Sequence, residues 1–294
     1  MNKLTRKHDY KEETIADVRK LISVTRELYK ENSENSPNMP VLAMPQEKDV
    51  ICYYNGMDIV HIEDGKWSIG ESFKNYIDEN INLRDYLLDP AADYKNLCDY
   101  LKKVQKHKPN EKERRCQQVI SVNNIKLLPK TFSVCGFETS LPGIEGEIDM
   151  VIFNPDKHEI CLVEYKCTTA ALTGDSDVIK HTNDYVRIIK TKKSELVDGM
   201  VDAYNVLRKI NGMKETKVDR KKIEVKILFL FTADNFENTD CINTKRVFKE
   251  VKNLYIGGEK PNQVRADDED KMNIFWEYAE SYKDYKFCSD NFMG

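Results

Sequence analysis

The chain has 294 residues, of which 40% are hydrophobic and 33% are charged, and its formal net charge is −4 at pH 7. This length and apolar content are enough for one large globular domain or two modest ones. The sequence contains no run of about 18 apolar residues, and its first residues lack the apolar stretch of a signal peptide. We therefore expect a cytoplasmic protein with no membrane association.

Eight cysteines are scattered along the sequence without a Cys-x-x-Cys pair. This pattern is typical of reduced, mostly buried thiols and argues against a structural zinc site. The sequence also lacks a Walker-type loop, a dinucleotide-binding glycine fingerprint and a His-Glu-x-x-His helix, so an unrelated nucleotide enzyme has no support.

The N-terminal segment begins with a helix and continues with strands. Residues 10–30 show helical spacing of apolar side chains, and a polar, proline-containing linker follows. Residues 50–69 alternate as strands do, and Asn55-Gly56 predicts a tight turn between the first two of them.

Helical spacing returns over residues 71–106, where aromatic and apolar side chains recur and Asp89-Pro90 interrupts them. We expect residues 1–105 to form an N-terminal α+β domain or elaboration.

A further helix is predicted over residues 111–122. Cys116, Val119 and Ile120 form its inward stripe, while Glu113 and Gln117 lie one turn apart on a neighbouring face. A strand over residues 132–137 follows.

Residues 143–167 carry the most informative pattern of the chain. Residues 150–153 and 160–163 are apolar on both alternating faces, which is typical of central strands covered from both sides. Asn154-Pro155 between them suits a type I turn in a loop of about four residues. The segment is therefore predicted to be a hairpin.

Charged residues occupy matching ends of this predicted hairpin. A hairpin centred on the turn pairs Asp149 with Glu164 and Glu147 with Lys166, and alternation places all four side chains on one face. Opposed carboxylates about 5 Å apart repel unless a cation or a proton lies between them. Mg²⁺ meets this demand, because it takes hard oxygen ligands from one or two carboxylates together with water and phosphate.

Asp149 and the tripeptide Glu164-Tyr165-Lys166 match the motif of the PD-(D/E)xK nuclease superfamily, which this segment resembles. The run that ends at Asp149 looks especially like the Holliday-junction-resolvase-type members, although Ile148 stands where the superfamily name has proline. The resemblance covers residues 110–232. It implies a restriction endonuclease-like α-β-β-β-α-β core, with a central mixed sheet flanked by helices.

The resemblance also implies a chemistry for these residues. Asp149 and Glu164 would hold Mg²⁺, with Mn²⁺ as a substitute, and the main-chain carbonyl of Tyr165 would be a further ligand. Lys166 would sit beside the attacking water, where its ammonium orients or stabilises the nucleophile. The expected activity is metal-dependent hydrolysis of phosphodiester bonds.

Two further acidic positions have alternative interpretations. Many superfamily members place a glutamate of the preceding helix at the metal site, for which Glu113 is the first choice and Glu111 the second. A surface salt bridge explains either residue as well. Glu147 either completes the metal shell or pairs with Lys166 and holds that side chain in place.

After the hairpin, residues 196–210 predict an amphipathic helix and residues 223–231 a buried strand. A right-handed crossover would set this strand parallel to the strand of Glu164. We therefore expect residues 106–294 to form the nuclease-like domain, with a C-terminal helical extension.

Charge is unevenly distributed along the chain. Residues 101–226 hold 24 Lys and Arg against 18 Asp and Glu, although the whole chain is acidic. The dense basic stretches could contact phosphates or form ordinary solvated helix faces, and they are residues 102–115, 180–193 and 214–226.

Nucleic acid is the expected partner, with DNA favoured over RNA, and a homodimer would suit the cutting of two strands. The alternative is a catalytically silent nuclease-fold module that binds nucleic acid or a protein. His181 and Tyr185, one helical turn apart, could contact the substrate backbone, or could be respectively exposed and packed in the core.

Overall fold

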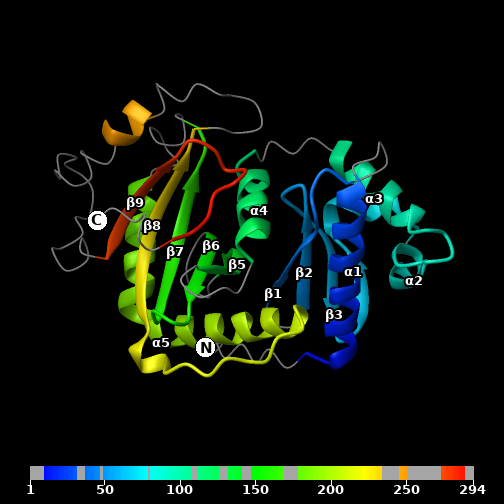
Figure 1. Ribbon diagram of the computed structural model, residues 1–294, viewed down its shortest axis with the longest axis horizontal. Helices are drawn as coiled ribbons and strands as arrows, with labels where there is room; N and C mark the ends of the chain where they lie inside the picture. The colour runs from blue at the N-terminus through cyan, green and yellow to red at the C-terminus, as the bar shows by residue number, and fades with distance from the viewer. Residues whose placement is uncertain are drawn as a thin grey trace.

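The structure is a computed structural model, shown in Figure 1. The residues that it describes are 10–31, 37–46, 49–78, 80–106, 112–125, 132–140, 147–168, 178–233, 245–250 and 273–288. None of the helices within these ranges is both long enough and apolar enough to cross a membrane.

The first part of the chain is a helix packed on a four-stranded antiparallel sheet, followed by short helices. The sheet has the order β1-β2-β3-β4. The elements are α1 (Glu12–Glu31), β1 (Leu42–Pro45), β2 (Asp49–Tyr54), β3 (Met57–Glu63), β4 (Lys66–Ile69), η1 (Glu71–Tyr76), α2 (Leu83–Leu87) and α3 (Lys95–Lys106).

The β2-β3 hairpin turns where the sequence predicts. Asn55 and Gly56 both have positive φ angles, 57° and 80°, which matches the backbone twist of a two-residue hairpin loop. A Cβ atom on Gly56 would lie 2.9 Å from the backbone nitrogen of Arg115, so the turn packs directly on the helix Lys112–Asn124. Glycine is therefore required there for both conformation and space.

The second part is a five-stranded mixed sheet with the order β5-β6-β7-β8-β9. β5, β6 and β7 are antiparallel neighbours, and β8 runs parallel to β7 as predicted. The elements are α4 (Lys112–Asn124), β5 (Ser133–Ser140), β6 (Glu147–Asn154), β7 (Glu159–Lys166), α5 (Val178–Ile210), η3 (Arg220–Lys222), β8 (Glu224–Thr232) and β9 (Ile274–Ala279). The predicted mixed α+β class is confirmed.

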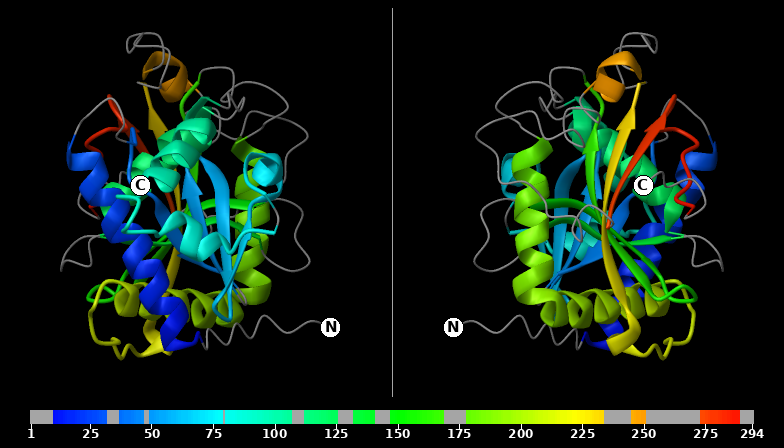
Figure 2. Two further views of the ribbon diagram at one scale, coloured as in Figure 1. Left: turned by 90° about the vertical axis from the view of Figure 1, so that its right-hand side faces the viewer. Right: turned by 90° about the vertical axis from the view of Figure 1, so that its left-hand side faces the viewer.

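Helices α4 and α5 cover opposite faces of this sheet (Figure 2). Phe153 of β6 packs edge-on against Tyr204 of α5, with ring centroids 5.0 Å apart. α5 has non-helical angles at Lys192, where two helical arms meet. One arm lies beside the end of β7, and the other runs across the sheet toward α1 (Figures 1 and 2).

Two strands were not predicted from the sequence. β1 has four residues that are all buried, so it shows no alternation to detect. β9 adds a parallel strand beside β8 from the C-terminal segment, for which we expected a helical extension. Residues 245–250 are helical, so the extension contains both kinds of structure.

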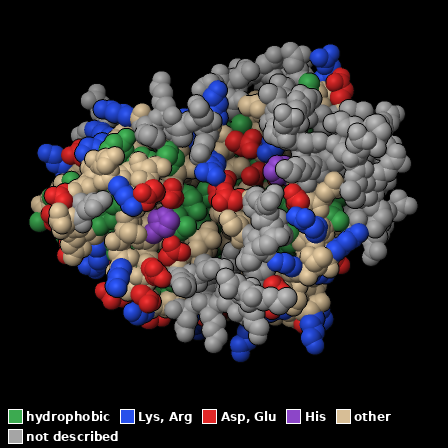
Figure 3. All heavy atoms as spheres, turned by 180° about the vertical axis from the view of Figure 1, so that it is seen from behind, with side chains coloured by type: hydrophobic (Ala, Val, Ile, Leu, Met, Phe, Trp, Pro, Cys, Tyr) green, Lys and Arg blue, Asp and Glu red, His purple; other side chains and the backbone are tan. Residues whose placement is uncertain are grey.

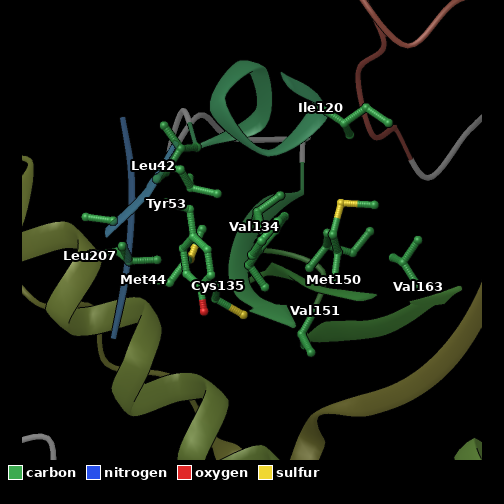
Figure 4. Close-up of a cluster of buried hydrophobic side chains, with 14 of the residues drawn as sticks. Leu42, Met44, Tyr53, Ile120, Val134, Cys135, Met150, Val151, Val163 and Leu207 are labelled. Carbon is green, nitrogen blue, oxygen red and sulfur yellow. The ribbon is translucent and has the colours of Figure 1, made fainter. Parts of the chain in front are cut away.

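The two sheets share one hydrophobic core (Figure 4). Tyr53 of the first sheet packs edge-on against Phe137 of the second, with ring centroids 4.7 Å apart. The buried Gln118 of α4 accepts a hydrogen bond from Gly56 N at 2.7 Å and donates to Tyr53 O at 3.1 Å. Hydrogen bonds therefore join the first sheet to α4. The two parts on either side of the expected boundary at residues 105/106 pack against each other.

Candidate active site

The β6-β7 hairpin has the predicted register. Asn154 accepts hydrogen bonds from the amides of Asp156 and Lys157 at 3.2 Å, which closes the turn. The strand pairing runs from Asn154↔Glu159 to Met150↔Val163. Extending this register by one residue brings Asp149 level with Glu164.

Asp149 is held at this point by the backbone. Its Oδ2 accepts a hydrogen bond of 2.8 Å from the amide of Tyr165. This charge-assisted hydrogen bond fixes the carboxylate against β7. The Tyr165 side chain is buried, with its hydroxyl 2.7 Å from that of Thr232. The role of the Tyr165 carbonyl as a ligand stays a prediction.

Lys166 lies at the end of β7 between acidic side chains. Its Nζ is 2.8 Å from Oε1 of Glu164 and 3.0 Å from Oε1 of Glu113, in the first turn of α4. Glu164 is 1% exposed and Lys166 is 7% exposed. The structure thus brings Glu113, the preferred helical acid, to the predicted site, whereas Glu111 lies outside the described residues.

The other oxygen of Glu164 faces α5. Tyr185 donates a hydrogen bond of 2.7 Å to Oε2, and His181 Nδ1 lies 3.7 Å from the same oxygen. Tyr185 is buried, so it stands behind Glu164 and not on the surface where it could contact a substrate backbone. His181 is half-buried.

Burial and the neighbouring charges shift the pKa values of the groups in this cluster. Burial and the nearby Glu164 raise the pKa of Asp149 well above its usual range. Burial also raises the pKa of Glu113, against the opposing effect of Lys166. For Lys166, burial acts to lower the pKa, but the carboxylates of Asp149, Glu164 and Glu113 outweigh it and raise the pKa. The ammonium form is therefore strongly favoured.

We expected Glu147 either to complete the metal shell or to pair with Lys166. Glu147 instead lies outside this cluster. It lies in an exposed position, and Arg114 Nη2 is 3.2 Å from its Oε2 and 2.8 Å from Oε2 of Glu138. Burial, together with a hydrogen bond to Glu147, raises the pKa of Glu138 to about 8. The expected partner Lys166 is held by Glu113 and Glu164 instead, because α4 brings its acid over the end of β7.

The donor set fits a hard divalent cation. Asp149 and Glu164 supply carboxylate oxygens, and Glu164 Oε1 is buried beside Lys166 without the angles of a hydrogen bond. Within the described ranges, no three His, Cys, Asp or Glu side chains converge on a common point as a complete metal cage. Two carboxylates are a donor set that Mg²⁺ commonly takes, with water and phosphate completing its coordination.

The basic stretches do not all surround this site. Residues 214–226 lead into the start of β8, which pairs with Glu159, and seven residue steps along β7 separate Glu159 from Lys166. At about 3.3 Å per residue this is roughly 23 Å. Lys226 and Arg220 are also neutralised by carboxylates, at 2.5 Å from Glu159 and 2.9 Å from Asp198. In Figure 3 acidic and basic side chains are interspersed over the described part of the face shown.

Comparison with known proteins gives no match: no family model, no curated protein and no solved structure is significantly similar to the chain.

Sequence reasoning missed Glu138 and the role of Tyr185. Glu138 lies between two residues of β5 that pair with Met150 and Ile148, so it is level with Asp149. We expected this strand to end at Phe137, which left Glu138 outside the sheet. For Tyr185, core packing was one of two interpretations of the sequence, but the hydroxyl contact with Glu164 depends on where α5 crosses β7.

Proposed function

We propose that the chain is a metal-dependent phosphodiester hydrolase of the PD-(D/E)xK type, acting on nucleic acid and preferentially on DNA. The observation that carries this proposal is the meeting of Lys166 with Glu164 and Glu113 beside Asp149, at the end of one buried strand. Buried charges of this kind are costly for stability, and their concentration at one site indicates a chemical role.

The order of elements supports the same proposal. α4, β5, β6, β7, α5 and β8 follow one another as the α-β-β-β-α-β core implied by the resemblance, and β8 is parallel to β7. By the resemblance, Asp149 would be the metal-binding carboxylate of such a core and Lys166 its catalytic lysine.

Each residue has a task that follows from its contacts. The Tyr165 amide orients Asp149, and the Tyr185 hydroxyl orients Glu164. These two carboxylates would hold Mg²⁺. When bound, Mg²⁺ offsets the charge that develops on the phosphate and lowers the pKa of a bound water. Lys166, held by Glu113 in the metal-free protein, would orient the attacking oxygen as a hydrogen-bond donor.

The proposal is tested with purified protein and supercoiled, linear, branched and single-stranded DNA, together with RNA, in Mg²⁺, Mn²⁺ or EDTA. We expect cleavage of at least one DNA substrate in Mg²⁺ or Mn²⁺ and none in EDTA. Lys166→Met should lower the cleavage rate by at least about a hundredfold. The matched control is Lys226→Met, which removes a half-buried lysine of β8 that pairs with Glu159 far from the site. Cleavage that persists in EDTA would contradict the proposal.

The alternative is a silent module of the same fold, and one observation favours it. The Lys166 ammonium already lies between Glu113 and Glu164 at ion-pair distance, so the cluster is partly neutralised without a metal. In this case the protein would bind nucleic acid or a protein partner without turnover. The substrate panel, run as a binding assay in parallel, separates the two.

A further inference from the structure

A second candidate site lies at the far end of α5 from the cluster around Lys166. An open cavity of about 320 Å³ lies between α1 and the C-terminal end of α5. Its lining includes three cations of α1, Arg19, Arg26 and Lys30, against the single carboxylate of Glu27. This volume falls at the lower end of the range of small-molecule pockets.

Arg26 has no counterion in the described part of the chain. No hydrogen bond or ion pair joins its guanidinium to a described residue, and burial lowers its pKa below the ordinary value. A half-buried, unpaired guanidinium is unfavourable unless an anion compensates it. Lys30, one turn further along α1, is exposed and also has no partner among the described residues.

The carbonyl groups at the C-terminal end of α5 do not bind Arg26 or Lys30. Arg19 donates to the carbonyls of Lys209 and Ile210 at 2.6 and 3.1 Å, and Gly212 N donates to Lys209 O at 2.9 Å. The last carbonyls of the helix, which would repel an anion, are therefore already satisfied. Arg26 and Lys30 remain available to a ligand.

We propose that this cavity binds a phosphate group through Arg26 and Lys30. A guanidinium pairs with phosphate through parallel hydrogen bonds, and the ammonium adds a mobile second charge. Buried Ile22 and Ile210 also line the cavity and offer an apolar surface to the organic part of the ligand. The phosphate is carried either by a small molecule of about mononucleotide size or by a nucleic-acid strand. This site does not depend on the proposed nuclease activity.

The test is titration calorimetry in EDTA, with inorganic pyrophosphate as one probe and a single-stranded DNA 12-mer as the other. We expect saturable binding of at least one probe at one site per chain. Arg26→Gln should weaken it about tenfold. Arg187→Gln is the control, because Arg187 is an exposed arginine of α5 that already pairs with Asp184 at 3.0 Å.

The two probes distinguish the sources of the phosphate. Binding of pyrophosphate that is sensitive to Arg26→Gln indicates a small ligand, and DNA binding with the same sensitivity but without pyrophosphate binding indicates a strand. No saturable binding of either probe, or equal weakening by Arg187→Gln, would overturn the proposal. Lys30→Gln provides a second variant if Arg26→Gln does not fold. A silent active site would leave these results unchanged, because no cleavage is measured.

Discussion

The hydroxyl of Tyr185 donates a hydrogen bond of 2.7 Å to Oε2 of Glu164, a carboxylate that is only 1% exposed. Through this contact α5 sets the orientation of a charge on β7. Lys166 lies 2.8 Å from the other oxygen of the same carboxylate. Glu164 is thus fixed from both sides, which is the arrangement expected of a group that must keep its geometry when a cation binds.

Removal of that hydroxyl tests its positioning role. Tyr185→Phe should lower kcat by about tenfold to a hundredfold and weaken Mn²⁺ binding, because a hydrogen bond to a charged group is worth about 1.5–3 kcal/mol. Cleavage rates and Mn²⁺ titrations measure these effects. The control is Tyr204→Phe, another buried tyrosine of α5, whose hydroxyl accepts from Arg208 at 3.4 Å. Equal effects of both substitutions would mean that only packing had changed.

Lys166 should stabilise the metal-free protein. Lys166→Met leaves buried carboxylates without their cation, which we expect to lower the free energy of unfolding by about 3 kcal/mol in EDTA. Mg²⁺ should raise the melting temperature of this variant, because a cation that binds only the folded state stabilises it. Chemical denaturation and thermal melting measure both effects. A variant as stable as the wild type in EDTA would show that Lys166 does not offset the carboxylates.

Substitution of Gly56 tests how much the contact between the N-terminal sheet and α4 contributes to stability. Gly56→Ala adds a Cβ at a φ of 80°, 2.9 Å from the backbone of Arg115 in α4. We expect a loss of about 1–3 kcal/mol in unfolding free energy, from the strained angle and the close contact. The control is Gly212→Ala, which has a similar φ of 72° but no atom within 4 Å of the added Cβ. If both variants lose the same stability, contact with α4 contributes nothing.

Much of the hairpin was predictable because its signals are local. The Asn154 turn and two apolar strands fix the register, and the register alone brings Asp149 level with Glu164. Glu113 could be named only as one choice of two, because its approach to Lys166 depends on the packing of α4. The contacts of Glu147 were not predictable, since the pairing of β6 with β7 ends at Met150 and Val163 and Arg114 is a long-range neighbour.

The N-terminal sheet contains a histidine whose protonation should contribute to stability. His61 lies 3.0 Å from both Asp49 and Asp58, and hydrogen bonds to these carboxylates raise its pKa from 6.5 to about 9. A raised folded-state pKa means that the stabilisation is complete below about pH 6.5 and is lost as the pH rises through 9.

The wild type should therefore lose on the order of 1 kcal/mol more unfolding free energy than His61→Asn between pH 6 and pH 10, since solvent screens this partly exposed group. Urea denaturation at a series of pH values measures the difference. Parallel pH curves for the two proteins would show that the ion pairs add nothing.

The central claim is that Asp149 and Glu164 hold a divalent cation beside Lys166. The most direct measurement is titration of the metal-free protein with Mn²⁺, followed by electron paramagnetic resonance of the free ion. We predict saturable binding by the wild type, lost in Asp149→Asn and in Glu164→Gln. It should be retained in Glu215→Gln, which removes an exposed carboxylate paired with Lys209. Undiminished Mn²⁺ binding by Asp149→Asn and Glu164→Gln, or no binding by the wild type, would contradict the account.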